Sequence, residues 1–115
     1  MGIEVSPERF GELVADALDA IPAELGRLME NVAVVVDDHS PPRGLLGRYD
    51  GIPLTERAEY GGMAMPDRIT IFRRALLAYC ESEDEVCEQV RITVVHEVAH
   101  HFGFDDDRLD QLGWA

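Results

Sequence analysis

Two histidines stand four positions apart in the segment H-E-V-A-H at positions 96–100, with a glutamate directly after the first. Residues four apart on an α-helix lie on one face, so His96 and His100 can offer their imidazoles to one cation. Neutral imidazole suits Zn²⁺, with Zn–N bonds of about 2.0–2.1 Å, and a catalytic zinc usually has three protein ligands and one open position. The pair therefore predicts a zinc site that needs a third ligand.

Candidates for the third ligand follow the second histidine. Gly103 can take a positive φ and turn the chain back sharply, which would return a residue two or three positions later to the metal. We expect that residue to be Asp106. Its neighbours Asp105 and Asp107 remain alternatives, because spacing alone does not settle a one-residue difference in the turn.

Glu97 lies beside the first histidine and can reach a water on the metal without being a ligand itself. We expect it to be the general base. Zinc would lower the pKa of that water towards about 7 and polarise a carbonyl group, while Glu97 takes the proton and later delivers it to the leaving amine. His101 points off the ligand face and is expected to support the site or lie on the surface. His39 lies in a polar loop, where we expect it to be solvated.

The segment resembles the extended motif H-E-x-x-H-x-x-G-x-x-H/D of the metzincin and Asp-zincin peptidases, in its aspartate form. The stretches R-I-T-I-F-R at 68–73 and D-D-D-R-L-D-Q-L-G-W at 105–114 are similar to the small bacterial zincin-like metallopeptidase family. The resemblance implies a single minimal zincin-like domain over 1–115, of the α+β class. In it, a small mixed sheet would pack on helices, with a long active-site helix near the C-terminus. It also implies zinc-dependent hydrolysis of peptide bonds in a peptide or protein substrate.

The chain departs from the metzincin pattern after the motif. Metzincins have a methionine-containing turn beneath the metal, but all four methionines here, at positions 1, 29, 63 and 65, precede the motif. Trp114 is the best candidate to replace it, although a tryptophan near a chain end is equally often a core or dimer contact. The short C-terminal part also lacks most of a pocket that would select a side chain. An edge strand, either Leu45–Tyr49 or Ile69–Phe72, is expected to pair with an extended substrate.

Two other functions remain open. A non-enzymatic interaction or regulatory domain could retain the zincin fold with a weak or vestigial metal site, and a homodimer would then be one way to complete a cleft. A metal-dependent hydrolase of a non-peptide amide is the third hypothesis, because activated water does not itself select a peptide.

The sequence also indicates the helices and strands that must position these residues. The longest is a helix over Glu81–Phe102: Ser82 and Glu85 fit a capping box, and apolar residues recur every fourth position from Val86 to Phe102. The other expected elements are a helix from Pro7 to Pro22 with Ser6 as N-cap, a short helix over Glu24–Asn31, a buried strand over Val32–Val36, a possible edge strand over Leu45–Tyr49, a half-buried strand over Arg68–Arg73 and a short helix over Asp107–Leu112.

Composition limits the partners and the location. The 115 residues fall in the size range of one domain, and 23 acidic against 10 basic side chains give a net charge of −13. This charge repels nucleic acid and anionic membranes, and no apolar run approaches the roughly 20 residues that a membrane span requires. The first residues lack the features of a secretory signal, so we expect a cytoplasmic protein. There, Cys80 and Cys87 would remain structural thiols.

Overall fold

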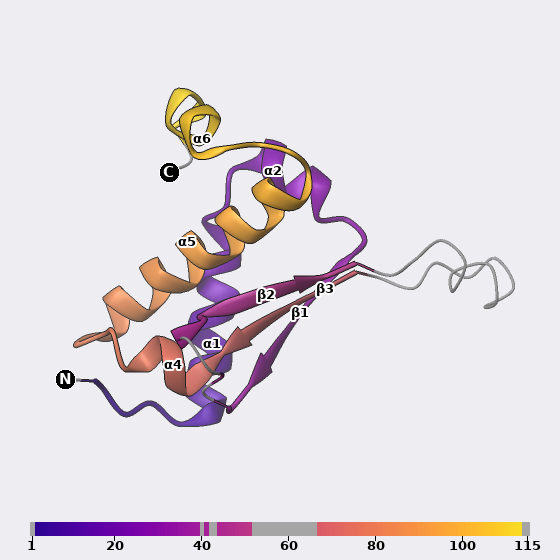
Figure 1. Ribbon diagram of the computed structural model, residues 1–115. Coiled ribbons are helices and arrows are strands. Elements are labelled where there is room, and N and C mark those ends of the chain that lie inside the picture. The colour runs from indigo at the N-terminus through magenta and orange to yellow at the C-terminus, as the bar shows by residue number, and fades with distance from the viewer. Residues whose placement is uncertain (1, 40, 42–43, 52–66, 114–115) are drawn as a thin grey trace, which may run out of the picture.

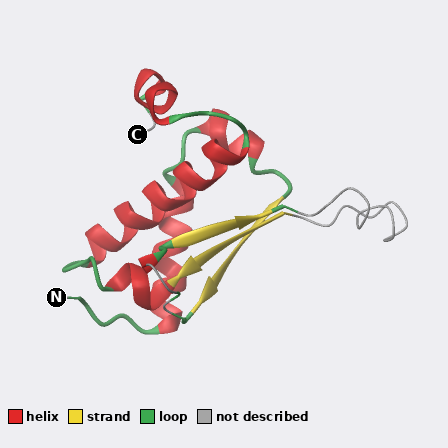
Figure 2. Cartoon of the chain, in the orientation of Figure 1, coloured by secondary structure: helices red, strands yellow, loops and turns green. Residues whose placement is uncertain are grey.

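The computed structural model describes residues 2–39, 41, 44–51 and 67–113, which form a mixed α+β fold (Figures 1 and 2). In chain order the elements are α1 (Pro7–Asp19), α2 (Ala23–Leu28), β1 (Val32–Asp37), β2 (Gly47–Asp50), β3 (Asp67–Phe72), α4 (Arg73–Leu77), α5 (Glu83–His101) and α6 (Asp106–Leu112). The predicted α+β class, a small mixed sheet on helices with a long helix near the C-terminus, is confirmed. The short helix α4 was not expected from the sequence.

The sheet has the order β1-β3-β2. Strand β1 pairs with β3 in parallel and β2 pairs with β3 in antiparallel fashion, so that Val34, Ile69 and Tyr49 are neighbours across the sheet. The burial predicted from the sequence was wrong for two strands. The run Val32–Val36 is an edge strand rather than a buried one, and Arg68–Phe72 is the central strand with only its first residue exposed. A β-branched run favours a strand, but the partners on either side decide how deeply it is buried.

The order of the strands also decides which of the two segments expected to pair with an extended substrate lies at an edge of the sheet. Because β3 has a partner on both sides, its segment Ile69–Phe72 cannot pair with a further strand. The expectation that Ile69–Phe72 could pair with an extended substrate was therefore wrong. The other expected strand was placed at Leu45–Tyr49 and forms β2 at Gly47–Asp50, which is indeed an edge strand.

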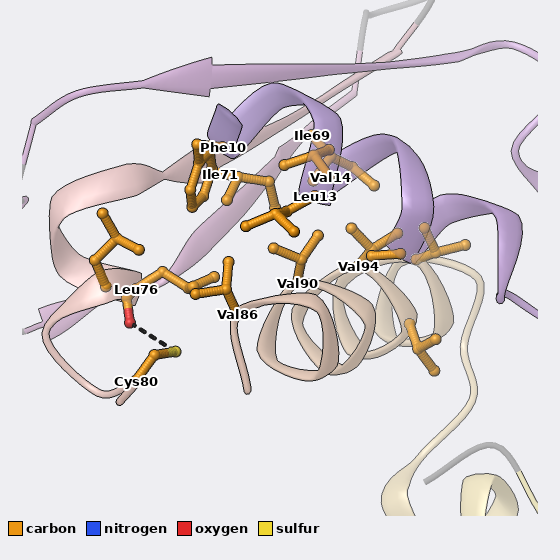
Figure 3. Close-up of a cluster of buried hydrophobic side chains, with 14 of the residues drawn as sticks. Phe10, Leu13, Val14, Ile69, Ile71, Leu76, Cys80, Val86, Val90 and Val94 are labelled. Carbon is orange, nitrogen blue, oxygen red and sulfur yellow. Dashed lines mark hydrogen bonds between the residues drawn. The ribbon is translucent and has the colours of Figure 1, made fainter. Parts of the chain in front are cut away.

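The hydrophobic core lies between the sheet and the helices α1 and α5 (Figure 3). Three sets of side chains meet there: one from α1, one from the inner face of β3 and one from α5. They include Phe10, Leu13, Val14, Ile69, Ile71, Val86, Val90 and Val94, of which all but Val14 are at most 2% exposed. This packing fixes the backbone of α5 against the sheet and therefore fixes the point from which each of its side chains projects.

Helix α5 begins and ends close to the predicted residues. The Ser82 side chain accepts a hydrogen bond from the Glu85 N–H, and the Glu85 carboxylate accepts one from the Glu81 N–H rather than from that of Ser82. The apolar stripe is buried from Val86 to Val98, but Phe102 at its expected end is exposed. The helix ends one residue earlier, and the turn that follows carries Phe102 away from the core.

Helix α1 also begins as predicted, with Ser6 capping it and Pro7 at its first position. Cys80 and Cys87 are free thiols, in agreement with the sequence prediction. Within the described residues, no helix combines the length and the apolar character needed to cross a membrane.

Candidate metal centre

The last two turns of α5 carry His96, Glu97 and His100. The rings of His96 and His100 are stacked, with centroids 5.8 Å apart and an angle of 30° between their planes. His96 and Glu97 are half-buried, whereas the His100 side chain is 54% exposed. The two imidazoles therefore lie on one face of the helix, close to the solvent.

The turn after α5 has the geometry of a Schellman motif. The Phe104 N–H donates to the Ala99 carbonyl at 2.8 Å and the Gly103 N–H donates to the His100 carbonyl at 3.1 Å. Gly103 has φ of 89°, a left-handed conformation that a residue with a side chain adopts at a cost. The positive φ predicted for this glycine is confirmed, and the chain reverses here towards the helix face that carries His100.

Helix α6 starts directly after this turn. Asp105 is its N-cap, with its carboxylate accepting a hydrogen bond from the Arg108 N–H at 2.8 Å. Asp106 comes next, and its Oδ1 lies 3.1 Å from Nε2 of His100. Leu109 is fully buried, so α6 is anchored to the core one turn further on. Of the acidic residues 105–107, the structure thus brings Asp106 to His100, and Asp105 caps helix α6.

His100 and Asp106 are within hydrogen-bonding distance of each other, and two ligands of one metal ion would lie slightly further apart. In a tetrahedral zinc site with bonds of about 2.0–2.2 Å, neighbouring ligand atoms are roughly 3.3–3.5 Å apart. The observed 3.1 Å between Nε2 and Oδ1 is near that range. In the described parts of the chain, however, no three His, Cys, Asp or Glu side chains are gathered closely enough to hold a metal ion. His96 and Asp106 would therefore have to reorient to share one ion with His100.

Glu97 is in a different environment from the surface carboxylates. Burial raises its pKa above the ordinary value, while His100, the main-chain N–H of Tyr49 and His96 act in the opposite direction. A carboxylate with a raised pKa is a stronger base than a solvated one and is suited to accepting a proton. Helix α5 packs against strand β2, and the main chain of Tyr49 on that strand is close to this carboxyl.

Sequence reasoning missed the side chains that surround His101. Tyr49 stacks on His101 with ring centroids 3.9 Å apart and an interplanar angle of 17°. The Tyr49 hydroxyl donates to Asp67 Oδ2 at 2.7 Å, and His101 Nε2 lies 3.9 Å from the same oxygen. The spacing along the chain carries no signal for this cluster, because its members come from β2, β3 and α5. His39, by contrast, is exposed as expected and pairs with Asp37.

With this geometry described, the chain can be compared with known proteins. The model of a family described as zincin-like metallopeptidase matches residues 29–114. The chain belongs to the zincin-like metallopeptidase family. The matched region includes all the candidate site residues of α5 and α6 together with the three strands, and it leaves out α1 and α2.

A solved structure shares the zincin-like fold. It is a conserved hypothetical protein from T. thermophilus, which is 23% identical, with a TM-score of 0.56 over 84% of this chain and 94% of the other. No curated protein matches the chain significantly. At 23% identity, the similarity to this solved structure supports the fold alone.

Trp114, the expected floor of the site, lies outside the described residues, as does Tyr60. The two later methionines, Met63 and Met65, lie outside them as well. What stands beneath the two histidines therefore stays a prediction from the sequence.

Proposed function

We propose that this zincin-like protein is a zinc-dependent peptidase, with His96, His100 and Asp106 as zinc ligands and Glu97 as general base. The observation that carries the proposal is the approach of Asp106 to His100 across the Gly103 turn, next to a half-buried glutamate. Three donors with an open fourth position are typical of catalytic rather than structural zinc.

Each residue has a distinct task. The two imidazoles and the Asp106 carboxylate would hold the ion at the C-terminal end of α5, where the helix dipole favours positive charge. When bound, zinc activates water and polarises the carbonyl of the scissile bond. Glu97 accepts the proton that the attacking water loses and passes it to the amine that leaves.

The substrate that suits this arrangement is an extended peptide. Among the described residues, strand β2 forms one edge of the sheet and packs against α5. An extended segment can add to such an edge through main-chain hydrogen bonds. Near the site, β2 is therefore the strand that we assign to substrate binding.

The test combines metal content with hydrolysis. We expect about one zinc per chain and cleavage of peptides in a diverse library by the wild type. Glu97→Gln should keep the zinc and lose most of the hydrolysis, because the amide cannot take a proton. Glu88→Gln is the matched control: Glu88 lies on the same helix, where it pairs with Arg91, and its substitution should leave hydrolysis unchanged. Stoichiometric zinc without cleavage of any peptide would contradict the proposal.

One observation favours a second candidate, an interaction domain with a weak metal site. The side chains of His100 and Asp106 are 54% and 78% exposed, so little surrounding structure holds them around an ion. Zinc titration separates the two functions, since a peptidase needs the ion bound tightly at micromolar zinc. Failure of the two histidines to retain zinc at that level would favour the interaction domain.

A further inference from the structure

The chain between the last buried residue of α5 and the first buried residue of α6 has little support from the core. Ala99 and Leu109 are both fully buried, whereas none of residues 100–108, all of which the structure describes, is buried. Two of the proposed zinc ligands, His100 and Asp106, lie in this stretch. Core packing fixes the two ends of the stretch, so the direction of the ligands within it also depends on contacts outside the core.

His101 makes such a contact with the sheet. The ring of Tyr49 in β2 stacks on its imidazole, with centroids 3.9 Å apart and 17° between the planes. The Tyr49 hydroxyl donates to Asp67 Oδ2 at 2.7 Å, and His101 Nε2 lies 3.9 Å from the same oxygen. The Asp67 side chain is only 13% exposed, and a hydrogen bond shielded from water is stronger than one in solvent. Tyr49 is thus fixed through its hydroxyl and presents its ring to His101.

The main chain just after β2 also lies against the imidazole. A Cβ placed on Gly51 would come within 3.3 Å of Cε1 of His101, which is closer than an ordinary van der Waals contact. The absence of a side chain at Gly51 therefore leaves the space in which the imidazole lies. His101 packs both on the ring of Tyr49 and near the backbone of Gly51.

A fixed His101 restricts the last turn of α5. Neighbouring side chains of an α-helix project about 100° apart, so holding the His101 ring fixes the rotation of this turn and the direction in which His100 projects. The same turn leads through Gly103 to Asp106. Three main-chain hydrogen bonds of 2.8–3.1 Å close this part of the chain, and their donors are the N–H groups of Phe102, Gly103 and Phe104.

We propose that Tyr49 is a positioning residue that, held by Asp67, anchors His101 and thereby orients the end of α5 for the metal ion. The metal part of this inference rests on the proposed peptidase function and its ligands, whereas the anchoring requires no metal. Ligands that are already oriented lose less freedom on binding. The contact therefore adds to zinc affinity although neither Tyr49 nor His101 is a ligand.

The anchoring is tested by hydrogen exchange of single amides in the full, zinc-free chain, followed by NMR. Tyr49→Leu removes both the ring and the hydroxyl. We expect the amides of residues 102–104 to exchange about three- to tenfold faster, the change associated with loss of one stacked aromatic pair. The amides of Ala20 and Ile21 close the end of α1 and can open without breaking this contact. Their exchange should stay unchanged, which controls for a general effect on the fold.

The effect on the metal is tested by competition titration with a chromophoric chelator, at a temperature where every variant is folded. Tyr49→Leu should bind zinc about three- to tenfold more weakly than the wild type, because the ion must then order the turn itself. Tyr49→Phe keeps the ring and loses the hydroxyl, so its affinity should lie between the two. Tyr79→Leu is the matched control, since Tyr79 is 65% exposed and precedes α5 at the end away from the site.

The two measurements separate this inference from the proposed function. Faster exchange at residues 102–104 together with weaker zinc binding supports the inference, even if no peptide is cleaved. Unchanged exchange in Tyr49→Leu overturns the anchoring, and faster exchange with unchanged zinc affinity overturns its role for the metal. If the wild type fails to bind zinc, the proposed function and the metal part fail together, while the exchange rates still decide the anchoring.

Discussion

His100 and Asp106 are six residues apart in the sequence and belong to different helices, yet their side chains meet at 3.1 Å. Spacing predicted the histidine pair directly, because helical periodicity alone puts residues 96 and 100 on one face. It left three candidates for the third ligand, because a turn can end one residue earlier or later. In the structure Asp105 instead accepts a hydrogen bond from the Arg108 N–H, a detail of capping geometry that spacing does not encode.

This difference gives a prediction at the residue scale. Asp106→Ala should weaken zinc binding far more than Asp107→Ala, the matched control in the same turn. Loss of an outer partner of a metal ligand costs roughly 10–100-fold in affinity, so loss of the ligand should cost at least that much. Competition titration with a chromophoric chelator measures both variants. Equal affinities would remove Asp106 from the ligand set.

The two thiols should also differ in reactivity. Burial raises the pKa of both Cys80 and Cys87, but Cys80 is fully buried and donates a hydrogen bond to the Leu76 carbonyl, whereas Cys87 is half-buried. Since the thiolate is the reactive form, a thiol reagent at neutral pH should modify Cys87 slowly and Cys80 only after unfolding. Mass spectrometry of the labelled protein checks this order. Labelling of Cys80 first would show that this part of the core opens.

At the scale of elements, the Gly103 turn is what joins the two halves of the site. Gly103→Ala should destabilise the protein by about 1–2 kcal/mol through its left-handed backbone. It should also weaken zinc binding, because relief of that strain moves Asp106. Gly113→Ala is the control: it also has a positive φ and open space around it, but it follows α6. We expect a similar loss of stability there with zinc affinity retained, and equal losses of affinity would argue against a special role of the first turn.

The sequence predicted the helices more completely than the sheet. Ser6, Ser82 and Gly103 mark helix ends through local hydrogen bonds, which a sequence encodes within a few residues. The central position of β3 and the exposed edge of β1 depend on partners far along the chain, so periodicity could not supply them. The helix α4 was missed because it starts directly at the end of β3, without a capping side chain.

For the molecule as a whole, the contact between Tyr49, Asp67 and His101 is one that no sequence motif could predict. It unites β2, β3 and α5, and only the folded chain brings them together. The motif at 96–106 names the residues of α5 and α6 that we propose as ligands and base, and the fold places this cluster beside them at the end of α5. No motif includes Tyr49 or Asp67, so the sequence gives no sign of these contacts to His101.

The ion pair between α1 and α5 gives a pH prediction for the whole fold. Arg9 donates to both carboxylate oxygens of Glu83 and lowers the pKa of this carboxyl. The stabilisation is therefore fully present above the ordinary glutamate pKa and is lost as the pH falls through the lowered one. Glu83→Gln should lower Tm slightly at pH 7 and have no effect at pH 2 or in high salt, because exposed pairs are weak and screened. Glu81→Gln serves as control, and an equal change of Tm at both pH values would exclude the pair as its cause.

The most direct test of the zinc site is X-ray absorption at the zinc edge of the zinc-loaded full chain. We predict one zinc per chain with two imidazole nitrogens and at least one oxygen at about 2.0–2.2 Å. The imidazole signal should fall in His96→Ala and in His100→Ala. A spectrum with sulfur neighbours, or one without imidazole, would contradict the site at α5 and α6.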